Sequence, residues 1–399
     1  MRWCSALSEE RDLVAAVREA GAALRRGLGG GEPHLVLAFV SERYRDAYGD
    51  LPSLVGCEFG RALIVGCSAS GVIGAGREVE GAGALSLTGA VLPGVSLHPF
   101  HVDLDELPDA AAEPGVWRRR IGVDVEGVGG ILLLADPYSF DVERLLAGLD
   151  RAFPGLPKIG GMASGGSAPG ENALYAGTRP YRSGAVGLAL AGAVRLEPIV
   201  AQGCRPIGAP MFVTACRENV LLELDGQPPL AVLQDLYARL DARDRDLCRR
   251  SLLLGVEMQA ARAAYGPGDF LIRNLLGSDR RRGAHRVGAV LREKQVVQFH
   301  VRDARTSAED LERRLGACAR ALGGRAPGGA ILFSCLGRGE SLYGRPGHDS
   351  EALRRSLGEV PLGGFFCNGE IGPVQGRTFL HGYTSAFALF LADRSDQSM

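Results

Sequence analysis

The sequence predicts an α/β protein in which repeated strand-helix-strand units form two packed mixed-sheet domains flanked by helices. Short apolar runs typical of buried strands alternate along the chain with amphipathic helical segments. The same order of strand, helix, strand, glycine turn and closing strand occurs three times, over residues 34–102, 131–190 and 330–391. Hydrophobic residues make up 46 % of the 399 residues and the net charge is −1, which argues against disorder.

Composition also argues against several classes of protein. The 57 glycines are about twice the usual share of about 7 %, but they follow no three-residue period, which excludes collagen. The 45 basic and 46 acidic residues nearly cancel, which argues against a surface built for nucleic acid or an anionic membrane. The longest smooth apolar run, 185–194, is too short to span a bilayer. We therefore expect neither nucleic acid nor a membrane as a partner.

The first residues and the cysteines favour a cytoplasmic location. The chain becomes charged almost at once and lacks the apolar core of a signal peptide. The nine cysteines form no C-x-x-C pair and no cluster with histidines at zinc spacing. We therefore expect free thiols in a reducing compartment and no metal site.

An N-terminal helix is expected within residues 1–29, ahead of the first copy. Ser8 is the expected N-cap, because acidic residues and then apolar residues at helical spacing follow it. Basic residues and glycines at Arg25-Arg26-Gly27 end the helix. The first copy is then predicted to contain a strand at 34–40, a helical stretch at 41–55 and strands at 63–66, 84–87 and 96–102.

The second and third copies repeat this order. For the second copy the predicted elements are a strand at 131–137, a helix at 140–153, a strand entering a glycine turn at 157–166 and a strand at 185–190. For the third copy they are a strand at 330–335, a helix at 349–357, a glycine turn at 361–369 and a strand at 385–391.

Each copy carries a glycine motif after its second strand. The motifs are Gly66-Cys-Ser-Ala-Ser-Gly71, Gly160-Gly-Met-Ala-Ser-Gly165 and Gly364-Phe-Phe-Cys-Asn-Gly369, all of the form G-x-x-x-x-G. None continues into the Lys-Ser/Thr of a P-loop, so no nucleotide is predicted there. Glycine permits sharp turns and close approach of the backbone to a ligand, so we expect a turn at each motif.

A boundary between two domains is expected near 198–203, where the second copy has closed. Beyond it, a strand at 219–224 and a helix at about 230–240 are predicted, and the charged stretch 241–250 is expected to be a solvated surface. The predicted divisions are an N-terminal helix (1–29), an N-terminal domain (30–200), a C-terminal domain (201–392) and a tail (393–399).

Several sequence blocks, quoted by their ends, resemble those of a known family. In the first half they are Gly66–Gly74, Ala135–Pro137 and Ile159–Ser164; in the second half they are Gly203–Gly208, Phe270–Gly277, Phe333–Gly339, Gly363–Gly372 and Phe379–Thr384. The first group resembles the N-terminal domain, and the second group the C-terminal domain, of the FIST family (F-box and intracellular signal transduction proteins). The resemblance extends in the expected order over nearly the whole chain.

This resemblance implies a cytoplasmic, bacterial sensory or signal-transduction protein that is not an enzyme. It further implies a small, amino-acid-like ligand, which we place in a cleft lined by the glycine turns, between or within the two domains. Eukaryotic relatives carry an F-box ahead of the FIST domains. Here the short segment before residue 30 is predicted to form one helix, so we expect no F-box.

Polar residues at the ends of two C-terminal strands are the first candidates for ligand contacts. Cys335, Arg338 and Gly339 follow a buried strand, at the sheet edge where open α/β folds bind ligands, and Arg338 could hold a carboxylate. Asn368 and Glu370 follow the next strand, and Glu370 could accept a ligand ammonium or pair with Arg338. The alternatives are an arginine that caps a helix or crosses a domain interface, and an ordinary Asn-Gly turn.

The remaining candidates are Arg273, Asn274, Cys67, Ser68 and Cys367. Arg273 and Asn274 follow an apolar run, so we expect them to face a pocket or an internal salt-bridge partner. Nearby backbone N–H groups could lower the pKa of the Cys67 and Cys367 thiols, as a nucleophile or redox sensor would need. For Ser68 we favour a hydrogen bond to the turn backbone.

Other functions stay open as alternatives. The same loops could bind a partner polypeptide, either as a scaffold or in a signalling complex. A thiol-dependent enzyme would use Cys67, Cys335 or Cys367. Some FIST relatives resemble haem-binding nitric-oxide sensors, and His348 or His381 could face a pocket, but no haem attachment motif is present. We therefore predict no cofactor and keep haem as an alternative.

Overall fold

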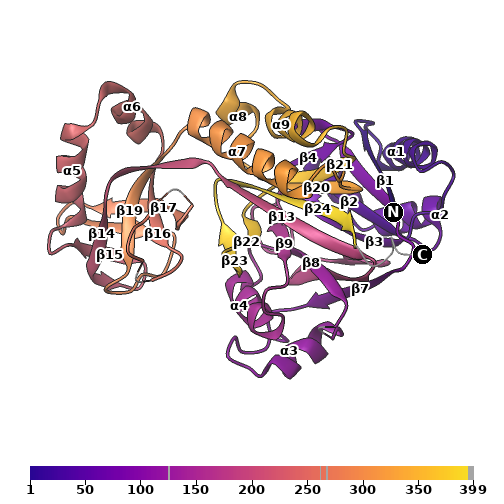
Figure 1. The fold of residues 1–399 in the computed structure, drawn as a ribbon, viewed down its shortest axis with the longest axis horizontal. Coiled ribbons are helices and arrows are strands. Elements are labelled where there is room, and N and C mark those ends of the chain that lie inside the picture. The colour runs from indigo at the N-terminus through magenta and orange to yellow at the C-terminus, as the bar shows by residue number, and fades with distance from the viewer. Residues whose placement is uncertain (125, 261, 267, 394–399) are drawn as a thin grey trace. The chain divides into compact units, whose positions relative to one another are not determined.

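The computed structural model describes residues 1–124, 126–260, 262–266 and 268–393, and it confirms the predicted fold class: mixed sheets flanked by helices (Figure 1). The chain divides into two compact units. The large unit comprises Met1–Ala201, Leu311–Leu380 and the chain from Thr384 onward; the barrel unit comprises Gln202–Asp310 and His381–Tyr383. All three predicted copies therefore lie in the large unit, apart from residues 381–383 of the third, whereas the predicted domains assigned the third copy to a separate half. The predicted tail, except its first residue, lies outside the described residues.

The large unit contains three six-stranded sheets with the same order of strands. The first sheet is β1 (Arg2–Ser8), β6 (Leu85–Val91), β2 (Leu35–Ser41), β3 (Leu63–Ala69), β10 (Leu174–Ala176) and β11 (Arg179–Tyr181). The second is β7 (Val95–Val102), β12 (Ala185–Gly192), β8 (Val128–Ala135), β9 (Lys158–Met162), β22 (Glu370–Val374) and β23 (Arg377–His381). The third is β13 (Val194–Gln202), β24 (Thr384–Ala392), β20 (Gly329–Cys335), β21 (Leu362–Cys367), β4 (Gly71–Gly74) and β5 (Arg77–Glu80).

The copies exchange hairpins in a cycle. In each sheet a parallel pair, β2–β3, β8–β9 or β20–β21, comes from one copy, and the hairpin at its edge comes from another. The first copy gives β4–β5 to the third sheet, the second gives β10–β11 to the first sheet, and the third gives β22–β23 to the second sheet. No copy therefore contributes all the strands of one sheet.

The first glycine of each motif lies inside a strand, so the prediction of a turn there was wrong. A Cβ on Gly66 would lie 1.8 Å from the carbonyl oxygen of Ala38 on the parallel neighbour. Gly160 has the same relation to Leu133, at 1.8 Å, and Gly364 to the oxygen of Leu332, at 2.0 Å. Glycine is required at all three positions because two strands approach closely. Gly364 also has a φ of +146°, which residues with a Cβ rarely adopt. The chain turns only at the end of each motif.

One face of every sheet packs into a common core. Phe39 of the first sheet stacks on Phe365 of the third with ring centres 4.9 Å apart, and Phe333 meets Phe365 edge-on at 5.8 Å. Leu132 and Val186 of the second sheet belong to the same buried cluster. The outer faces are also covered, which explains the continuous apolar runs in the sequence.

Helices cover the outer faces of the three sheets. The first sheet packs against α1 (Leu13–Gly27), α2 (Leu51–Phe59) and the short 3₁₀ helix η1 (Glu42–Ala47); the second against α3 (Pro114–Ile121) and α4 (Val142–Ala152); the third against α7 (Ala304–Leu322) and α9 (His348–Leu357), with the one-turn α8 (Glu340–Tyr343) between β20 and α9. Within the described ranges, no helix is long and apolar enough to cross a membrane.

The N-terminal segment is a strand followed by a helix, so the prediction of a helix begun by Ser8 was wrong. Strand β1 pairs with β6 along its whole length, and this ladder holds Ser8 in an extended conformation. Helix α1 begins after Asp12, whose carboxylate accepts a hydrogen bond from the backbone N of Ala15 at 3.0 Å.

The barrel unit is a closed sheet of antiparallel strands with two helices. In order around the barrel, the strands are β14 (Cys204–Arg217), β15 (Val220–Leu224), β18 (Ala284–Val287), β17 (Phe270–Asp279), β16 (Leu252–Glu257) and β19 (Val296–Arg302). Helix α5 (Pro229–Arg239) confirms the helix expected near 230–240. The stretch expected to be only a solvated surface forms α6 (Ala242–Arg250), which is capped by the Asp241 carboxylate and buries Cys248.

Candidate functional site

The three glycine motifs meet through the small polar residue before each second glycine. These residues are Ser70, Ser164 and Asn368. Ser164 Oγ accepts a hydrogen bond from the backbone N of Ser70 at 2.9 Å and donates to the carbonyl of Phe366 at 2.5 Å. Asn368 Nδ2 donates to the carbonyl of Ala163 at 3.0 Å. These side chains therefore join the three copies to one another.

Ser68 makes the backbone contacts that we expected of it. Its Oγ donates to the carbonyl of Ser164 at 3.1 Å and accepts a hydrogen bond from the backbone N of Ala173 at 3.1 Å. The hydroxyl is fully buried. Ser68 and Asn368, both predicted ligand contacts, are therefore engaged with backbone groups inside the large unit.

Arg338 forms a buried, bidentate ion pair with Asp349. Arg338 is 0 % exposed; its Nε lies 2.9 Å from Asp349 Oδ2, and its Nη2 lies 3.0 Å from Asp349 Oδ1 and 2.6 Å from the Tyr343 hydroxyl. Burial acts to raise the pKa of Asp349, but the Arg338 charge and several hydrogen bonds lower it well below its ordinary value. The guanidinium that we expected to hold a ligand carboxylate thus holds a carboxylate of the protein.

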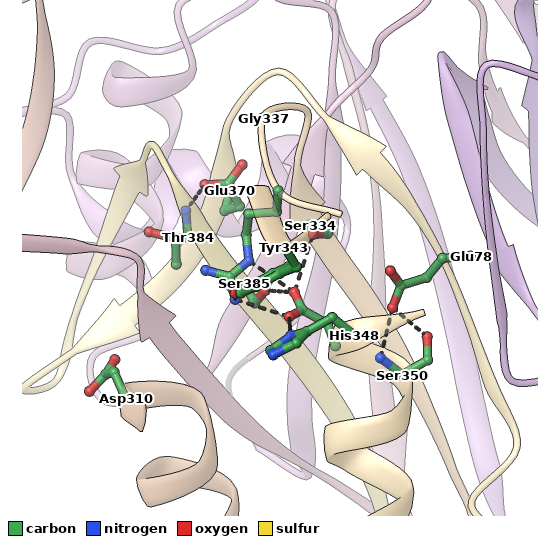
Figure 2. A network of polar contacts seen from close by, with 12 residues as sticks. Glu78, Asp310, Ser334, Gly337, Tyr343, His348, Ser350, Glu370, Thr384 and Ser385 are labelled. Atoms are coloured by element: carbon green, nitrogen blue, oxygen red, sulfur yellow. Dashed lines mark hydrogen bonds and ion pairs between the residues drawn. The ribbon is translucent and has the colours of Figure 1, made fainter. Parts of the chain in front are cut away.

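Further polar side chains contact Asp349; His348, Ser334 and Ser385 are labelled in Figure 2. His348 Nδ1 lies 2.9 Å from Asp349 Oδ1, and the His348 ring stacks on Tyr343 with centres 3.5 Å apart. Ser385 donates to Asp349 Oδ2, and Ser334 lies 3.4 Å from the same oxygen. The Asp349 carboxylate is therefore bound from several sides.

Glu370 is a second fully buried carboxyl. Its Oε2 accepts a hydrogen bond from the backbone N of Thr384 at 3.0 Å, and its Oε1 lies 3.3 Å from Cys367 Sγ. Burial raises the pKa of Glu370 to about 8, although these hydrogen bonds and the charge of Arg338 act to lower it. Near neutral pH this carboxyl is mostly protonated.

Two more carboxyls come from β5, in the hairpin supplied by the first copy. Glu78 Oε1 accepts hydrogen bonds from the backbone N and the hydroxyl of Ser350, at 2.7 and 2.8 Å (Figure 2). Burial raises the pKa of Glu78 to about 7. Glu80 Oε1 accepts from the backbone N of Glu340 at 2.8 Å, and Gly339 leaves room for it, because a Cβ there would lie 2.1 Å from this oxygen.

We call these groups the third-copy cluster; it comprises Glu78, Glu80, Ser334, Cys335, Arg338, Tyr343, His348, Asp349, Ser350, Cys367, Glu370 and Ser385. The sequence indicates this cluster because the third copy has polar residues where the other two copies have apolar ones. Across β20 and β24 the third copy pairs Ser334 with Ser385. Ser334 lies two residues after Leu332, which faces the first glycine of its motif. At the same place in the first and second copies the paired residues are apolar: Val40 with Leu85, and Ala135 with Ala185. Aligning the copies in this way would have indicated a buried polar site, although sequence reasoning missed Asp349 and Glu78.

The cysteine environments differ from the expectation. Cys67 and Cys367 are both 0 % exposed, and burial raises the pKa of each thiol well above its ordinary value. The expected lowering of these pKa values was wrong: the loss of solvation raises both, and at Cys367 it outweighs the backbone N–H of Gly369, which acts to lower the pKa. Cys335 is half-buried at the end of β20.

Arg273 and Asn274 belong to the barrel unit, unlike the other predicted site residues. Both lie on β17, where Arg273 Nη1 donates to the carbonyl of Ile272 at 3.2 Å. Asn274 Oδ1 accepts a hydrogen bond from the Tyr383 hydroxyl. Among the predicted residues, the structure brings together Cys335, Arg338, Gly339, Cys367 and Glu370.

The barrel unit contains a cavity of about 410 Å³ that sequence reasoning missed. Its lining residues are Val220, Leu276, Gly277, Ser278, Asp279, Arg282, Ala284, His285 and Arg286. His285 is 2 % exposed; its Nδ1 lies 2.8 Å from Ser278 Oγ, and its Nε2 has no hydrogen-bond partner among the described residues. Burial lowers the pKa of His285, so its ring is neutral near pH 7. The lining residues come together because β17 pairs with β18, and no local sequence motif predicts that pairing.

Comparison with known sequences identifies the family. The sequence matches the FIST N domain over residues 34–227 and the FIST C domain over residues 229–373. The chain belongs to the FIST family. This confirms the resemblance, and FIST domains are sensory domains of signal transduction.

Full-length relatives of this FIST protein occur in mycobacteria. An uncharacterized protein of Mycobacterium tuberculosis is 37 % identical over 391 residues, covering 98 % of this chain and 100 % of that protein. An uncharacterized protein of Mycobacterium bovis is 37 % identical over 379 residues, covering 95 % and 96 %. Among solved structures, a cyanuric acid hydrolase aligns over 98 % of this chain and 99 % of its own with 9 % identity and a TM-score of 0.37, a likeness that supports no functional argument.

Proposed function

We propose that this FIST protein is a cytoplasmic sensory protein that binds a small, amino-acid-like molecule in the cavity of its barrel unit. The observation that carries the proposal is the unpartnered Nε2 of His285, a buried side chain in the cavity wall. Leaving a buried polar atom without a hydrogen bond costs about 1–3 kcal/mol. This nitrogen is shielded from solvent, so a ligand reaches it by displacing the wall atoms that cover it. A ligand that then supplies the missing partner recovers this free energy and so favours the bound state.

The cavity lining matches the chemistry of an amino acid. Arg282 and Arg286 supply positive charge for a carboxylate, and Asp279 supplies negative charge for an ammonium group. The Arg282–Asp279 ion pair is long, at 3.9 Å, and exposed, so both groups can exchange it for ligand contacts. Leu276 and Val220 offer apolar surface to a ligand side chain. A cavity of about 410 Å³ lies within the usual range for small-molecule sites.

This proposal moves the ligand away from the glycine motifs. Arg338 is bound by Asp349 and Tyr343, and Asn368 by the backbone of Ala163. A ligand there would first have to break hydrogen bonds inside the protein. The cytoplasmic location is supported by the thiols, because all nine cysteines, each among the described residues, are free.

The test is a binding screen on the full chain. Each of the twenty standard amino acids is added singly, the thermal midpoint is measured, and any hit is confirmed by calorimetry. We expect at least one to raise the midpoint, because a ligand at a hundred times its Kd stabilises the folded state by about 2.7 kcal/mol. His285→Leu should abolish the effect at a cost in stability of at most about 1.5 kcal/mol, since it removes the hydrogen bond to Ser278 together with the unpartnered Nε2.

Arg250→Ala serves as the control, because Arg250 is 75 % exposed on α6 and does not line the cavity. It should bind like the wild type. If no amino acid binds, the ligand class is wrong. If His285→Leu binds a confirmed ligand as tightly as the wild type, the site is wrong.

A further inference from the structure

Two cysteines of the third-copy cluster lie side by side on neighbouring strands. Cys335 ends β20, Cys367 ends β21, and the two residues are direct partners in the parallel register. Neighbouring strands lie about 4.8 Å apart. This spacing falls within the Cα separation of about 4.4–6.8 Å that disulfides span. Residues paired directly across a sheet also point to the same face, so the two thiols are close without refolding.

This pair of thiols is specific to the third copy. In the first copy the equivalent residues are Ser41 and Ala69, which are register partners on β2 and β3. In the second copy they are Asp136 and Ala163, which directly follow the paired residues Ala135 and Met162. The shared architecture therefore does not require sulfur at either position.

The two thiols differ in access, and a carboxyl lies beside the inner one. Cys335 is half-buried and precedes Leu336, which is 39 % exposed, whereas Cys367 is 0 % exposed. Cys367 Sγ lies 3.3 Å from Glu370 Oε1 and 3.3 Å from the carbonyl of Ser334. An oxidant from solvent therefore meets Cys335 first, and the protonated Glu370 carboxyl lies where it can take the Cys367 proton in exchange for its own.

We propose that Cys335 and Cys367 are a redox-active dithiol that hydrogen peroxide converts to a disulfide. In the first step the Cys335 sulfur attacks peroxide, forming a sulfenic acid and releasing one water. In the second step the Glu370 carboxyl gives its proton to the departing hydroxyl of that sulfenic acid and takes the Cys367 proton in exchange, and the sulfur–sulfur bond forms with release of a second water. The two thiols lose two electrons in total, and peroxide gains them. This inference does not depend on the proposed ligand site.

Oxidation would act directly on the buried ion pair. Cys335 is three residues before Arg338, and Cys367 is three residues before Glu370. A bond between the ends of β20 and β21 removes the thiol hydrogen bond to Glu370 and restrains the loop that carries Arg338. The third-copy cluster would thereby change its hydrogen bonding with the redox state of the cell.

The test is peptide mass spectrometry of the full chain after treatment with one equivalent of hydrogen peroxide. We expect a disulfide-linked peptide pair containing Cys335 and Cys367, a loss of two hydrogens from the intact mass, and reversal by dithiothreitol. Cys367→Ala should stop the reaction at the Cys335 sulfenic acid, which dimedone labels. Cys335→Ser should leave Cys367 reduced.

Each variant introduces the residue found at the equivalent position of the first copy: Ser41 for Cys335 and Ala69 for Cys367. Both variants are therefore expected to fold, which circular dichroism checks. Cys57→Ser removes an exposed thiol on α2 and should leave the linked pair unchanged. The proposal is overturned if no Cys335–Cys367 peptide forms in folded wild-type protein. It is also overturned if Cys367→Ala yields no dimedone adduct at Cys335.

Discussion

Asp349 and Glu370, two fully buried carboxyls of one cluster, have pKa values shifted in opposite directions. Burial alone raises the pKa of both. Arg338 contacts Asp349 through two nitrogens and keeps it ionised, whereas burial dominates at Glu370 and brings its pKa to about 8. Near neutral pH the cluster thus holds one complete ion pair beside a mostly neutral carboxyl. A poorly solvated site favours this distribution of charge.

Arg338→Ala should be strongly destabilising. The substitution leaves Asp349 charged and buried without its partner, which typically costs about 3–5 kcal/mol. Urea unfolding measures the loss. Arg354→Ala is the matched control, because Arg354 is 62 % exposed and its ion pair with Glu359 is long, at 3.8 Å, so the change should cost less than about 1 kcal/mol. Equal losses in the two variants would show that the buried pair contributes no more than a surface pair.

Glu370→Gln should alter how stability depends on pH. Between the ordinary pKa of 4.5 and the native pKa of about 8, the unfolded chain releases this proton while the native state keeps it. The native state then binds more protons, so the Glu370 contribution is fully present below pH 4.5 and is lost as pH rises toward 8. The slope is up to about 1.4 kcal/mol per pH unit.

Urea unfolding at pH 5 and pH 8 measures this effect. Glutamine cannot ionise, so the free energy of unfolding of the wild type should fall relative to that of Glu370→Gln between the two pH values. Glu359→Gln is the control, because Glu359 is 87 % exposed. Parallel pH profiles for wild type and Glu370→Gln would contradict a raised pKa at Glu370.

At the level of elements, the recurring feature is a parallel pair of strands that approach each other closely at a glycine. Gly66, Gly160 and Gly364 each face a carbonyl oxygen of the neighbouring strand at a distance that no side chain can share. The strand therefore continues past the first glycine, and beyond its end Ser70, Ser164 and Asn368 make the contacts between copies. One local requirement, repeated three times, positions the ends of all three strands.

Gly66→Ala should disrupt the first sheet. The added Cβ would lie 1.8 Å from the Ala38 oxygen, so β2 and β3 must separate, at a cost of about 3 kcal/mol or more. Soluble yield and the urea midpoint measure the effect. Gly49→Ala is the control, because a Cβ at the exposed Gly49 would have no atom of the described chain within 4 Å. A soluble Gly66→Ala protein with wild-type stability would contradict the proposed role of this close approach.

For the whole molecule, the exchange of hairpins decides which parts can fold alone. Residues 1–201 contain every strand of the first sheet but lack β20, β21 and β24 of the third sheet and β22 and β23 of the second. Without them, the face that carries Phe39 loses its partner Phe365. The barrel unit, in contrast, closes its sheet with strands from 204–302 alone.

Two fragments test this difference. Residues 202–310 should give a monomer with dispersed amide resonances and cooperative unfolding, because their barrel has no open edge. Residues 1–201, close to the predicted N-terminal domain with its helix, should aggregate or bind hydrophobic dyes, because the common core is exposed. Gel filtration and NMR measure both. A monomeric, cooperatively unfolding 1–201 fragment would show that the hairpins from the third copy are dispensable.

Much of the fold could be predicted because its signals are local. Short segments of sequence are enough to recognise the apolar runs of β2, β8 and β20 and the three glycine motifs. Together these features indicate repeated α/β units. Strand β1 was missed because an isolated segment does not show that β6 pairs with it. In the candidate site, Arg338, Cys335, Cys367 and Glu370 were found together because each follows one of two adjacent strands.

The sequence by itself therefore determined the fold class, the three copies and the membership of the FIST family. Only the tertiary structure decided that β5 of the first copy brings Glu78 to Ser350, that Arg338 pairs with Asp349, and that His285 lines a cavity. The physical reason is that strand and helix periods depend on neighbours along the chain. The partner of a buried charge depends instead on which distant segments exclude water together.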